Sequence, residues 1–291
     1  MSVELSVLVP GIRSHRWQAL YDSIGESFSG SWEMVIIGPF EPSEELMSKS
    51  NVVYIKDFGS PIRCQQIGLL QCNGEYITWA ADDGLYFPKS LDVGFELLRN
   101  SDKVNKDIPF HHNLVMGMYY EGYTGVVTPN LVHMGEEPYY ILNNHAQNVS
   151  LKNLPPDTFM LNVGIVSTKL LKEVGGWDCC FEVCPCSYND LAIRLKKYGV
   201  NFIIQHEVMY HCTHMPVRSG DHGPIHDAQT QHDEPLFREI YNSADYKNRI
   251  NVNIESWKHC PEVWARRFGN DEESMPKSYS EIPLDTKQYR W

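Results

Sequence analysis

Short apolar runs alternate with segments of helical spacing along the first third of the chain. The apolar runs cover residues 5–9, 32–37, 52–55 and 76–80, and each is followed by glycine, proline or charged residues. Between them, residues 17–28 and 61–73 carry apolar side chains at helical spacing. Strands that alternate with helices indicate a parallel sheet. The pattern predicts an α/β fold with a mostly parallel central sheet flanked by helices.

The pattern changes after a helix predicted to begin at Pro88. Residues 108–149 are rich in aromatic residues and histidine, and the alternation at 114–120 predicts a small added antiparallel sheet. A strand at 160–166, a helix ending at Gly175, a helix over 188–195 with Asp190 in its first turn, and a strand at 201–205 follow, and His211 comes just after this last core strand. We expect a core domain over 1–215 and a C-terminal extension over 216–291 that packs on it and ends in a loosely held tail.

One apolar run stops at two adjacent carboxylates. Tyr76 to Ala80 form a predicted buried strand, and Asp82, Asp83 and Gly84 come directly after it. Open α/β sheets bind ligands beyond the carboxyl ends of their strands. A turn with two solvated aspartates explains this stretch equally well when it is considered alone.

The charge balance excludes some partners. The chain has 25 Lys and Arg against 37 Asp and Glu, a formal net charge of -12, which argues against nucleic acid or an anionic membrane as a partner. An anionic substrate would therefore need a local cation. No apolar run is long enough for a signal segment or a membrane span, so we expect a cytoplasmic protein without a transmembrane segment. Four of the eight cysteines cluster at Cys179, Cys180, Cys184 and Cys186, a spacing more typical of buried or loop thiols than of zinc ligands.

Four ordered blocks together carry a family resemblance. They are 6–10, 68–77 leading to Asp82 and Asp83, 175–178, and 190–195 with Gly199. In this order the chain resembles the inverting GT-A glycosyltransferases, especially family 2, over roughly residues 1–211. The resemblance implies a GT-A fold and transfer of a sugar, with inversion, from a nucleotide-diphosphate donor to a glycan or other hydroxyl acceptor. A UDP-sugar is the favoured donor.

The resemblance also implies a divalent cation, Mn²⁺ or Mg²⁺, held by hard oxygen ligands. Asp82 matches the last aspartate of the family's Asp-x-Asp motif, whereas Ala80 stands at the first position. The implied metal ligands are Asp82, Asp83 and His211, with His214 as a nearby substitute for the histidine. The ion would act as Lewis acid and template for the departing diphosphate.

Further roles follow from matching positions. The implied donor-binding residues are Pro10, Gly11, Arg13, Asp57, Arg63, Asp82 and Asp83. Gly38-Pro39-Phe40 stand where relatives carry base-reading acids, and Gln65-Gln66 replace an Arg-Asn pair. These departures leave the base of the donor open.

Asp190 is the predicted general base that takes the acceptor's proton. Relatives often carry Glu-Asp shortly before this position, where Ser187 and Tyr188 stand here. The alternative for Asp190 is a carboxylate that satisfies backbone N–H groups at a helix start. Gly176, Trp177 and Asp178 are the implied acceptor or sugar residues. An aromatic set could stack on sugars or fill the core: Trp177, Tyr119, Tyr120 and His133.

Other functions remain open. The missing first aspartate and the missing Glu-Asp pair favour a non-catalytic GT-A-like module that binds a sugar nucleotide or a glycan. A nucleotidyltransferase is less favoured, because no glycine-rich phosphate loop with a following basic residue comes after the first strand. A zinc-organised interaction protein built on the cysteine cluster is the weakest alternative.

Overall fold

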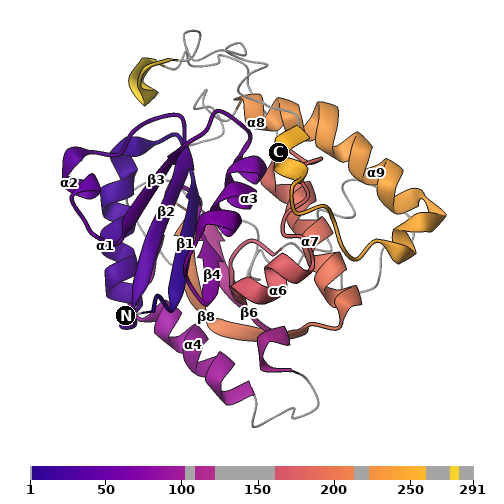
Figure 1. The fold of residues 1–291 in the computed structure, drawn as a ribbon, viewed down its shortest axis with the longest axis horizontal. Helices are drawn as coiled ribbons and strands as arrows, with labels where there is room; N and C mark the ends of the chain where they lie inside the picture. The colour runs from indigo at the N-terminus through magenta and orange to yellow at the C-terminus, as the bar shows by residue number, and fades with distance from the viewer. Residues whose placement is uncertain (1, 102–108, 122–160, 213–222, 260–275, 282–291) are drawn as a thin grey trace.

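The computed structural model describes residues 2–101, 109–121, 161–212, 223–259 and 276–281. Within these ranges the strands form one eight-stranded sheet in the order β3-β2-β1-β4-β7-β6-β8-β5. Helices cover both faces of this sheet (Figure 1). The predicted α/β fold class is confirmed.

The first half of the sheet is parallel. Its strands are β1 (Leu5–Pro10), β2 (Trp32–Gly38), β3 (Val52–Lys56) and β4 (Tyr76–Trp79). β1 lies between β2 and β4, with Leu5 opposite both Trp32 and Tyr76. Because the strands run the same way, the loop after β1 and the acidic stretch after β4 leave the sheet at one edge.

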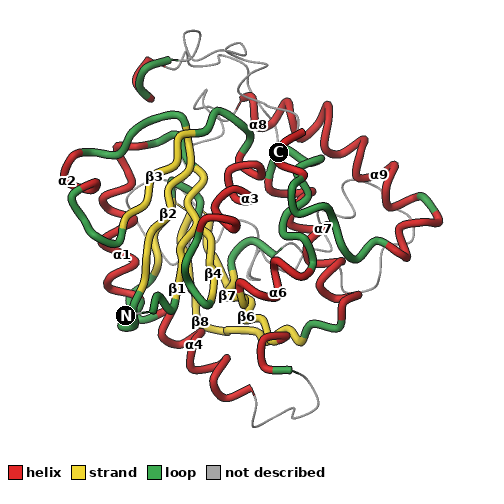
Figure 2. The backbone as a smooth tube through the Cα atoms, in the orientation of Figure 1, coloured by secondary structure: helices red, strands yellow, loops and turns green. Residues whose placement is uncertain are grey.

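The second half of the sheet is mixed. Its strands are β7 (Gly164–Ser167), β6 (Asn113–Glu121), β8 (Asn201–Cys212) and β5 (Gly84–Tyr86). The pairs β4·β7, β7·β6 and β8·β5 are antiparallel, whereas β6·β8 is parallel. In the described residues the antiparallel strands thus continue the central sheet and do not form a second one (Figure 2). The strand predicted at 201–205 continues through Cys212, so His211 lies within β8 and not after it.

Helices with apolar faces cover the sheet on both sides. They are α1 (Trp17–Ser27), α2 (Glu44–Met47), α3 (Pro61–Gln71), α4 (Ser90–Ser101), α6 (Thr168–Glu173), α7 (Cys184–Tyr198), α8 (Gly223–Ala228) and α9 (Glu234–Asn242). Within the described ranges, none of the helices combines the length and the apolar composition that crossing a bilayer requires. Short helical turns also occur: η1 (Ser14–Arg16), η2 (Phe110–His112), η3, a π-helix (Gln229–Asp233), η4 (Ala244–Asn248), η5 (Ser256–His259) and η6 (Tyr279–Glu281).

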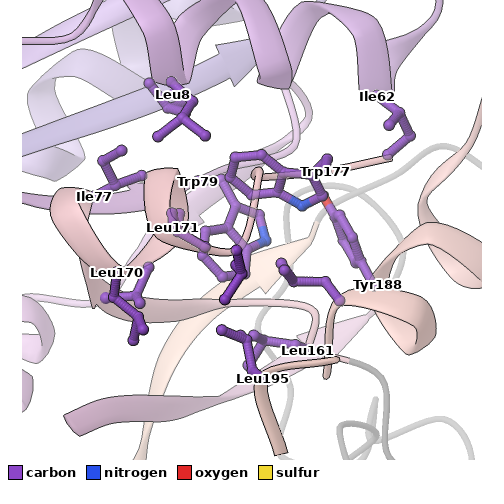
Figure 3. Packing of buried hydrophobic residues seen from close by; sticks show 14 of the residues in the cluster. Leu8, Ile62, Ile77, Trp79, Leu161, Leu170, Leu171, Trp177, Tyr188 and Leu195 are labelled. Atoms are coloured by element: carbon purple, nitrogen blue, oxygen red, sulfur yellow. The ribbon is translucent and has the colours of Figure 1, made fainter. Parts of the chain in front are cut away.

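Two apolar clusters lie on opposite faces of the sheet, because neighbouring strand residues point to opposite sides. Leu8 packs with side chains of α3, α6 and α7, whereas Val7 and Val9 pack with side chains of α1 and α4. The first cluster is centred on Trp79 and Trp177 (Figure 3). These clusters fix the strand ends that form the candidate site.

The described part of the C-terminal extension packs on α7. Phe237 and Tyr241 of α9 are fully buried against Phe181, Cys186 and Ile193. Residues 213–222, which include the predicted boundary at 215, lie outside the described residues, as do 262–268 and 282–291. The division into core and extension therefore stays a prediction.

Candidate active site

The loop after β1 folds onto Asp82 at the edge of the parallel strands. The backbone N–H groups of Ile12 and Arg13 donate to Asp82 Oδ2 at 2.6 and 2.7 Å, and the Arg13 guanidinium pairs with Asp82 Oδ1. Asp82 is 4% exposed. A Cβ on Gly11 would lie 2.6 Å from the Cβ of Asp82, so the approach requires glycine at this position. Of the predicted donor residues, the structure thus brings Pro10, Gly11, Arg13 and Asp82 together.

Asp83 lies beside this loop. Arg16 Nη1 donates to the backbone oxygen of Asp83 at 3.2 Å, and Arg13 Nη1 lies 3.8 Å from Asp83 Oδ2. The Cys212 thiol contacts Asp83 Oδ1 at 3.3 Å. Two arginines therefore balance the charge of the two aspartates at this edge of the sheet.

The predicted metal ligands do not form a site in this arrangement. N–H donors engage both oxygens of Asp82. His211 lies opposite Leu85 in the β5·β8 ladder and is 6% exposed, and burial lowers its pKa. Among the described residues, three potential ligands converge only at His111, His112 and Glu173, not at Asp82, Asp83 and His211. Protein N–H donors thus occupy both oxygens of Asp82, and a Mn²⁺ or Mg²⁺ ion at these residues stays a prediction.

Two further predicted donor residues bind each other. Arg63 Nε lies 3.0 Å from Asp57 Oδ2, and both side chains are mostly buried. Arg63 Nη1 also donates to the backbone oxygen of Trp257 at 2.7 Å, and its guanidinium lies 5.4 Å from the centre of the Trp257 ring. Because Arg63 and Asp57 form an ion pair, their charges neutralise each other. Arg63 also connects the start of α3 to η5 of the C-terminal extension.

The Gly175-Gly176-Trp177 turn is a buried structural element. Both glycines have positive φ (85° and 74°), and the Gln66 side chain bonds to the oxygen of Gly175 and the N–H of Trp177, each at 2.9 Å. Trp177 has no exposed surface, and its ring centre lies 5.4 Å from that of Trp79 in an edge-on contact (Figure 3). The predicted role of Trp177 at a sugar does not fit this position. It is a core residue.

Asp190 is the centre of a buried ionic network. Arg194 Nε donates to its Oδ2 at 2.7 Å, while Tyr241 Oη and Arg249 Nε donate to its Oδ1, each at 2.8 Å. Arg249 also pairs with Asp178. Burial opposes ionisation of Asp190, but Arg194 and Arg249 outweigh it, so the pKa of Asp190 is lowered. Both predicted residues, Asp190 and Asp178, thus face protein cations.

The predicted helix start near Tyr188 is wrong. α7 begins at Cys184, with Pro185 in its first turn, where proline is favoured. Asp190 therefore lies in the second turn and is fully buried, so it does not cap backbone N–H groups. Its carboxylate is engaged on both oxygens, and this geometry does not present it to an acceptor. The role of Asp190 as general base stays a prediction.

The sequence analysis did not predict a contact between Asp233 and His232 near the start of α7. The Asp233 carboxylate accepts from the N–H groups of Glu182 and Val183 at 3.0 and 2.9 Å, and His232 Nδ1 lies 2.7 Å from Asp233 Oδ1. Burial raises the pKa of Asp233 although these partners oppose it. The His232 side chain is 33% exposed. The π-helical turn that carries both residues is a rare conformation often found at functional sites, but no sequence pattern predicts it.

An apolar cluster connects the segments that carry this histidine to the Asp82 loop. Ile12, whose N–H binds Asp82, packs in one small apolar cluster with Val183, whose N–H binds Asp233. Ala228, directly before the π-helical turn, belongs to the same cluster. The fold therefore joins His232 and Asp233 to the edge where Arg13 and Asp82 meet.

The cysteine cluster consists of free thiols. Burial raises the pKa of Cys184 to about 11 and also raises that of Cys180 and Cys186. Among the described residues, these thiols form no group of three or more potential metal ligands. Tyr119 and Tyr120 lie on β6, and nothing of their side chains is described, while His133 and His214 fall outside the described residues.

Comparison with known proteins identifies the fold. No protein-family model and no curated protein matches the chain. Among solved structures, S. aureus TarS is 18% identical with a TM-score of 0.50, covering 85% of this chain and 42% of TarS. Its fragment 1–349 is 17% identical with a TM-score of 0.49, covering 88% of this chain and 71% of the fragment. The same fragment in complex with UDP is 17% identical with a TM-score of 0.48, covering 74% and 62%.

The chain thus spans 42% of the length of the TarS chain that it matches at a TM-score of 0.50. TarS is a GT-A-like glycosyltransferase. The TM-score of 0.50 at 18% identity shows a shared fold and does not establish a shared activity. The chain has the fold of a GT-A-like glycosyltransferase.

Proposed function

We propose that this chain is a glycosyltransferase that binds a nucleotide-sugar donor at the edge formed by the loop after β1 and by Asp82. The observation that carries the proposal is the placement of Arg13 and Asp82 at the carboxyl ends of adjacent parallel strands. A guanidinium group has five N–H donors and matches phosphate geometry. We place Arg13 at a diphosphate oxygen of the donor, next to Asp82.

The donor diphosphate would be stabilised by protein cations. Arg13 and Arg16 both lie within hydrogen-bond or ion-pair distance of the Asp82-Asp83 stretch. Fixed positive charge at the departing diphosphate lowers the barrier, because negative charge develops there in the transition state. The requirement for Mn²⁺ or Mg²⁺ stays a prediction, and no step of the proposal depends on it.

The acceptor hydroxyl requires a base, and we assign this role to His232. Asp233 holds His232 Nδ1 at 2.7 Å and is itself fixed by two backbone N–H groups. A carboxylate that accepts a hydrogen bond from Nδ1–H sets the tautomer of the ring. The other nitrogen, Nε2, is then the one that can accept a proton. Transfer of the hydroxyl proton to His232 would accompany attack on the anomeric carbon, consistent with inversion at that carbon.

The test is turnover of nucleotide sugars. UDP-, GDP-, CDP- and dTDP-sugars are incubated with the full chain and a panel of hydroxyl acceptors, with Mn²⁺ or with a chelator, and release of the nucleoside diphosphate is measured. We expect release from a UDP-sugar that falls at least tenfold in Arg13→Gln and His232→Gln, while Asp22→Asn, on the exposed face of α1, retains it. Activity that is unchanged in Arg13→Gln would contradict the proposed donor site.

The buried Asp190 favours a second candidate, a non-catalytic module that binds a sugar nucleotide or a glycan. The residue that the family resemblance offers as base is engaged by Arg194, Arg249 and Tyr241. This candidate predicts saturable donor binding that depends on Arg13 and no turnover with any acceptor. Rapid turnover that is lost in His232→Gln would exclude it.

A further inference from the structure

Two histidines and a glutamate meet at the opposite end of the sheet from Asp82. His111 and His112 form the end of η2, directly before β6, and Glu173 is the last residue of α6, which follows β7. Because β6 and β7 are antiparallel, the start of β6 meets the end of β7. Ser167 of β7 pairs with Tyr76, the first residue of β4, whereas Asp82 follows the last. The four residues of β4 separate these ends by roughly 10 Å or more.

The three side chains converge on a common point. His111 Nε2 and His112 Nε2 each lie 3.8 Å from Glu173 Oε2, and the two imidazole rings meet edge-on with centres 4.4 Å apart. One ligand atom from each residue lies within 4.8 Å of the other two. Tetrahedral Zn²⁺ with bonds of about 2.0–2.1 Å sets neighbouring ligand atoms roughly 3.3 Å apart. Small movements of the side-chain tips would therefore complete the geometry.

Surrounding groups orient the carboxylate and leave the site accessible. Tyr198 Oη donates to Glu173 Oε2 at 3.2 Å, a support of the kind that commonly surrounds metal ligands. Lys169 Nζ lies 3.8 Å from the other oxygen, Oε1, and opposes a cation by its charge. The three candidate ligands are 20–30% exposed, so an ion can enter from solvent.

A pocket adjoins the cluster. Its volume is about 670 Å³, and His111 and Glu173 line it together with Lys169 and Lys172. Two imidazoles and one carboxylate occupy three positions of a tetrahedral ion, and a water would take the fourth. Two lysines and two glutamates, Glu75 and Glu173, line this pocket, so its charges balance.

We propose that His111, His112 and Glu173 bind one Zn²⁺ ion that connects η2 to α6. The ion would link two segments far apart in the sequence, at a place remote from the proposed donor site. The zinc site shares no residue with the donor site, so a negative result at one site does not bear on the other.

The experiment titrates ZnCl₂ into the chelator-treated full chain by calorimetry and follows thermal unfolding with and without Zn²⁺. We expect one Zn²⁺ site and a rise in Tm in the wild type and in the control His206→Ala, which alters an exposed histidine of β8. In the double variant His111→Ala/His112→Ala, we expect affinity at least 100-fold weaker and no rise in Tm. Tyr198→Phe should bind about tenfold more weakly, since it loses only the supporting hydrogen bond.

A second variant keeps the test decisive if the double variant does not fold. Glu173→Gln removes one ligand charge at a partly exposed position, and it should weaken Zn²⁺ binding at least tenfold. Tetrahedral Co²⁺ absorption that appears in the wild type and is lost in these variants would support the ligand set. Unchanged Zn²⁺ affinity in folded Glu173→Gln and in the folded double variant, or no Zn²⁺ binding by the wild type, would overturn the proposal.

Discussion

Replacing Asp190 by asparagine separates a structural role from a catalytic one. The substitution removes the carboxylate between two guanidinium groups. Arg194, which has no exposed surface, then loses the one ionic partner that it has among the described residues. Arg249 retains Asp178. Breaking a buried pair in this way costs about 3–5 kcal/mol of unfolding free energy. At about 2–4 °C per kcal/mol, the expected fall in Tm is roughly 6–20 °C.

The assay is denaturant or thermal unfolding of the wild type, Asp190→Asn and Asp22→Asn, with turnover measured on the same samples. We expect the exposed Asp22→Asn to remain within about 0.5 kcal/mol of the wild type. A folded Asp190→Asn that matches wild-type stability but loses turnover would refute the structural role and restore Asp190 as the base. Loss of stability with turnover retained below the new Tm would support the network.

Three further outcomes follow from single residues. In denaturant unfolding, Gly38→Ala should destabilise the chain by more than about 2 kcal/mol, because the new Cβ would lie 2.0 Å from the backbone oxygen of Gly11. The control Gly25→Ala, in helix α1 with ordinary contacts, should be neutral or stabilise the chain by about 0.5–1 kcal/mol. Cys184 should resist iodoacetamide at pH 8 in the native state, since burial raises its pKa to about 11, and peptide mass spectrometry would detect alkylation that contradicts this. Because the pKa of Asp190 is lowered, its contribution to the free energy of unfolding is present above the unfolded-state pKa of about 4 and is lost as pH falls through the folded-state pKa. The difference in unfolding free energy between wild type and Asp190→Asn should therefore narrow in acid. A difference that is independent of pH down to about 2 would contradict the ion pairing.

The sequence is sufficient to predict the parallel half of the fold because its signals are local. The β-rich run that ends at Asp82 forms β4, and Pro61 begins α3 with Ser60 as its N-cap, as proline and serine favour. The close approach of the β1 loop to Asp82 follows from strand order alone. Parallel neighbours bring their carboxyl ends to one edge, so the loop residues predicted at the donor lie there.

The rest depends on partners distant in the chain. Asp190 accepts a hydrogen bond from Arg249, 59 residues away, and the sequence around Asp190 does not predict this contact. Trp177 has the composition of a sugar-stacking residue, but long-range packing against Trp79 makes it a core residue. The start of α7 could have been predicted, because Pro185 is typical of a first helical turn. The apolar pattern from Tyr188 onward indicated a later start.

Calorimetric titration of UDP-sugars into the full chain tests the proposed donor site most directly, because binding is measured without an acceptor or a metal requirement. The matched proteins are the wild type, Asp82→Asn, Arg13→Gln and the exposed control Asp22→Asn. The account predicts saturable binding to the wild type and to Asp22→Asn, weakened at least tenfold in Arg13→Gln and in Asp82→Asn. Equal affinity in all four proteins, or no binding of any nucleotide sugar to the wild type, would contradict it.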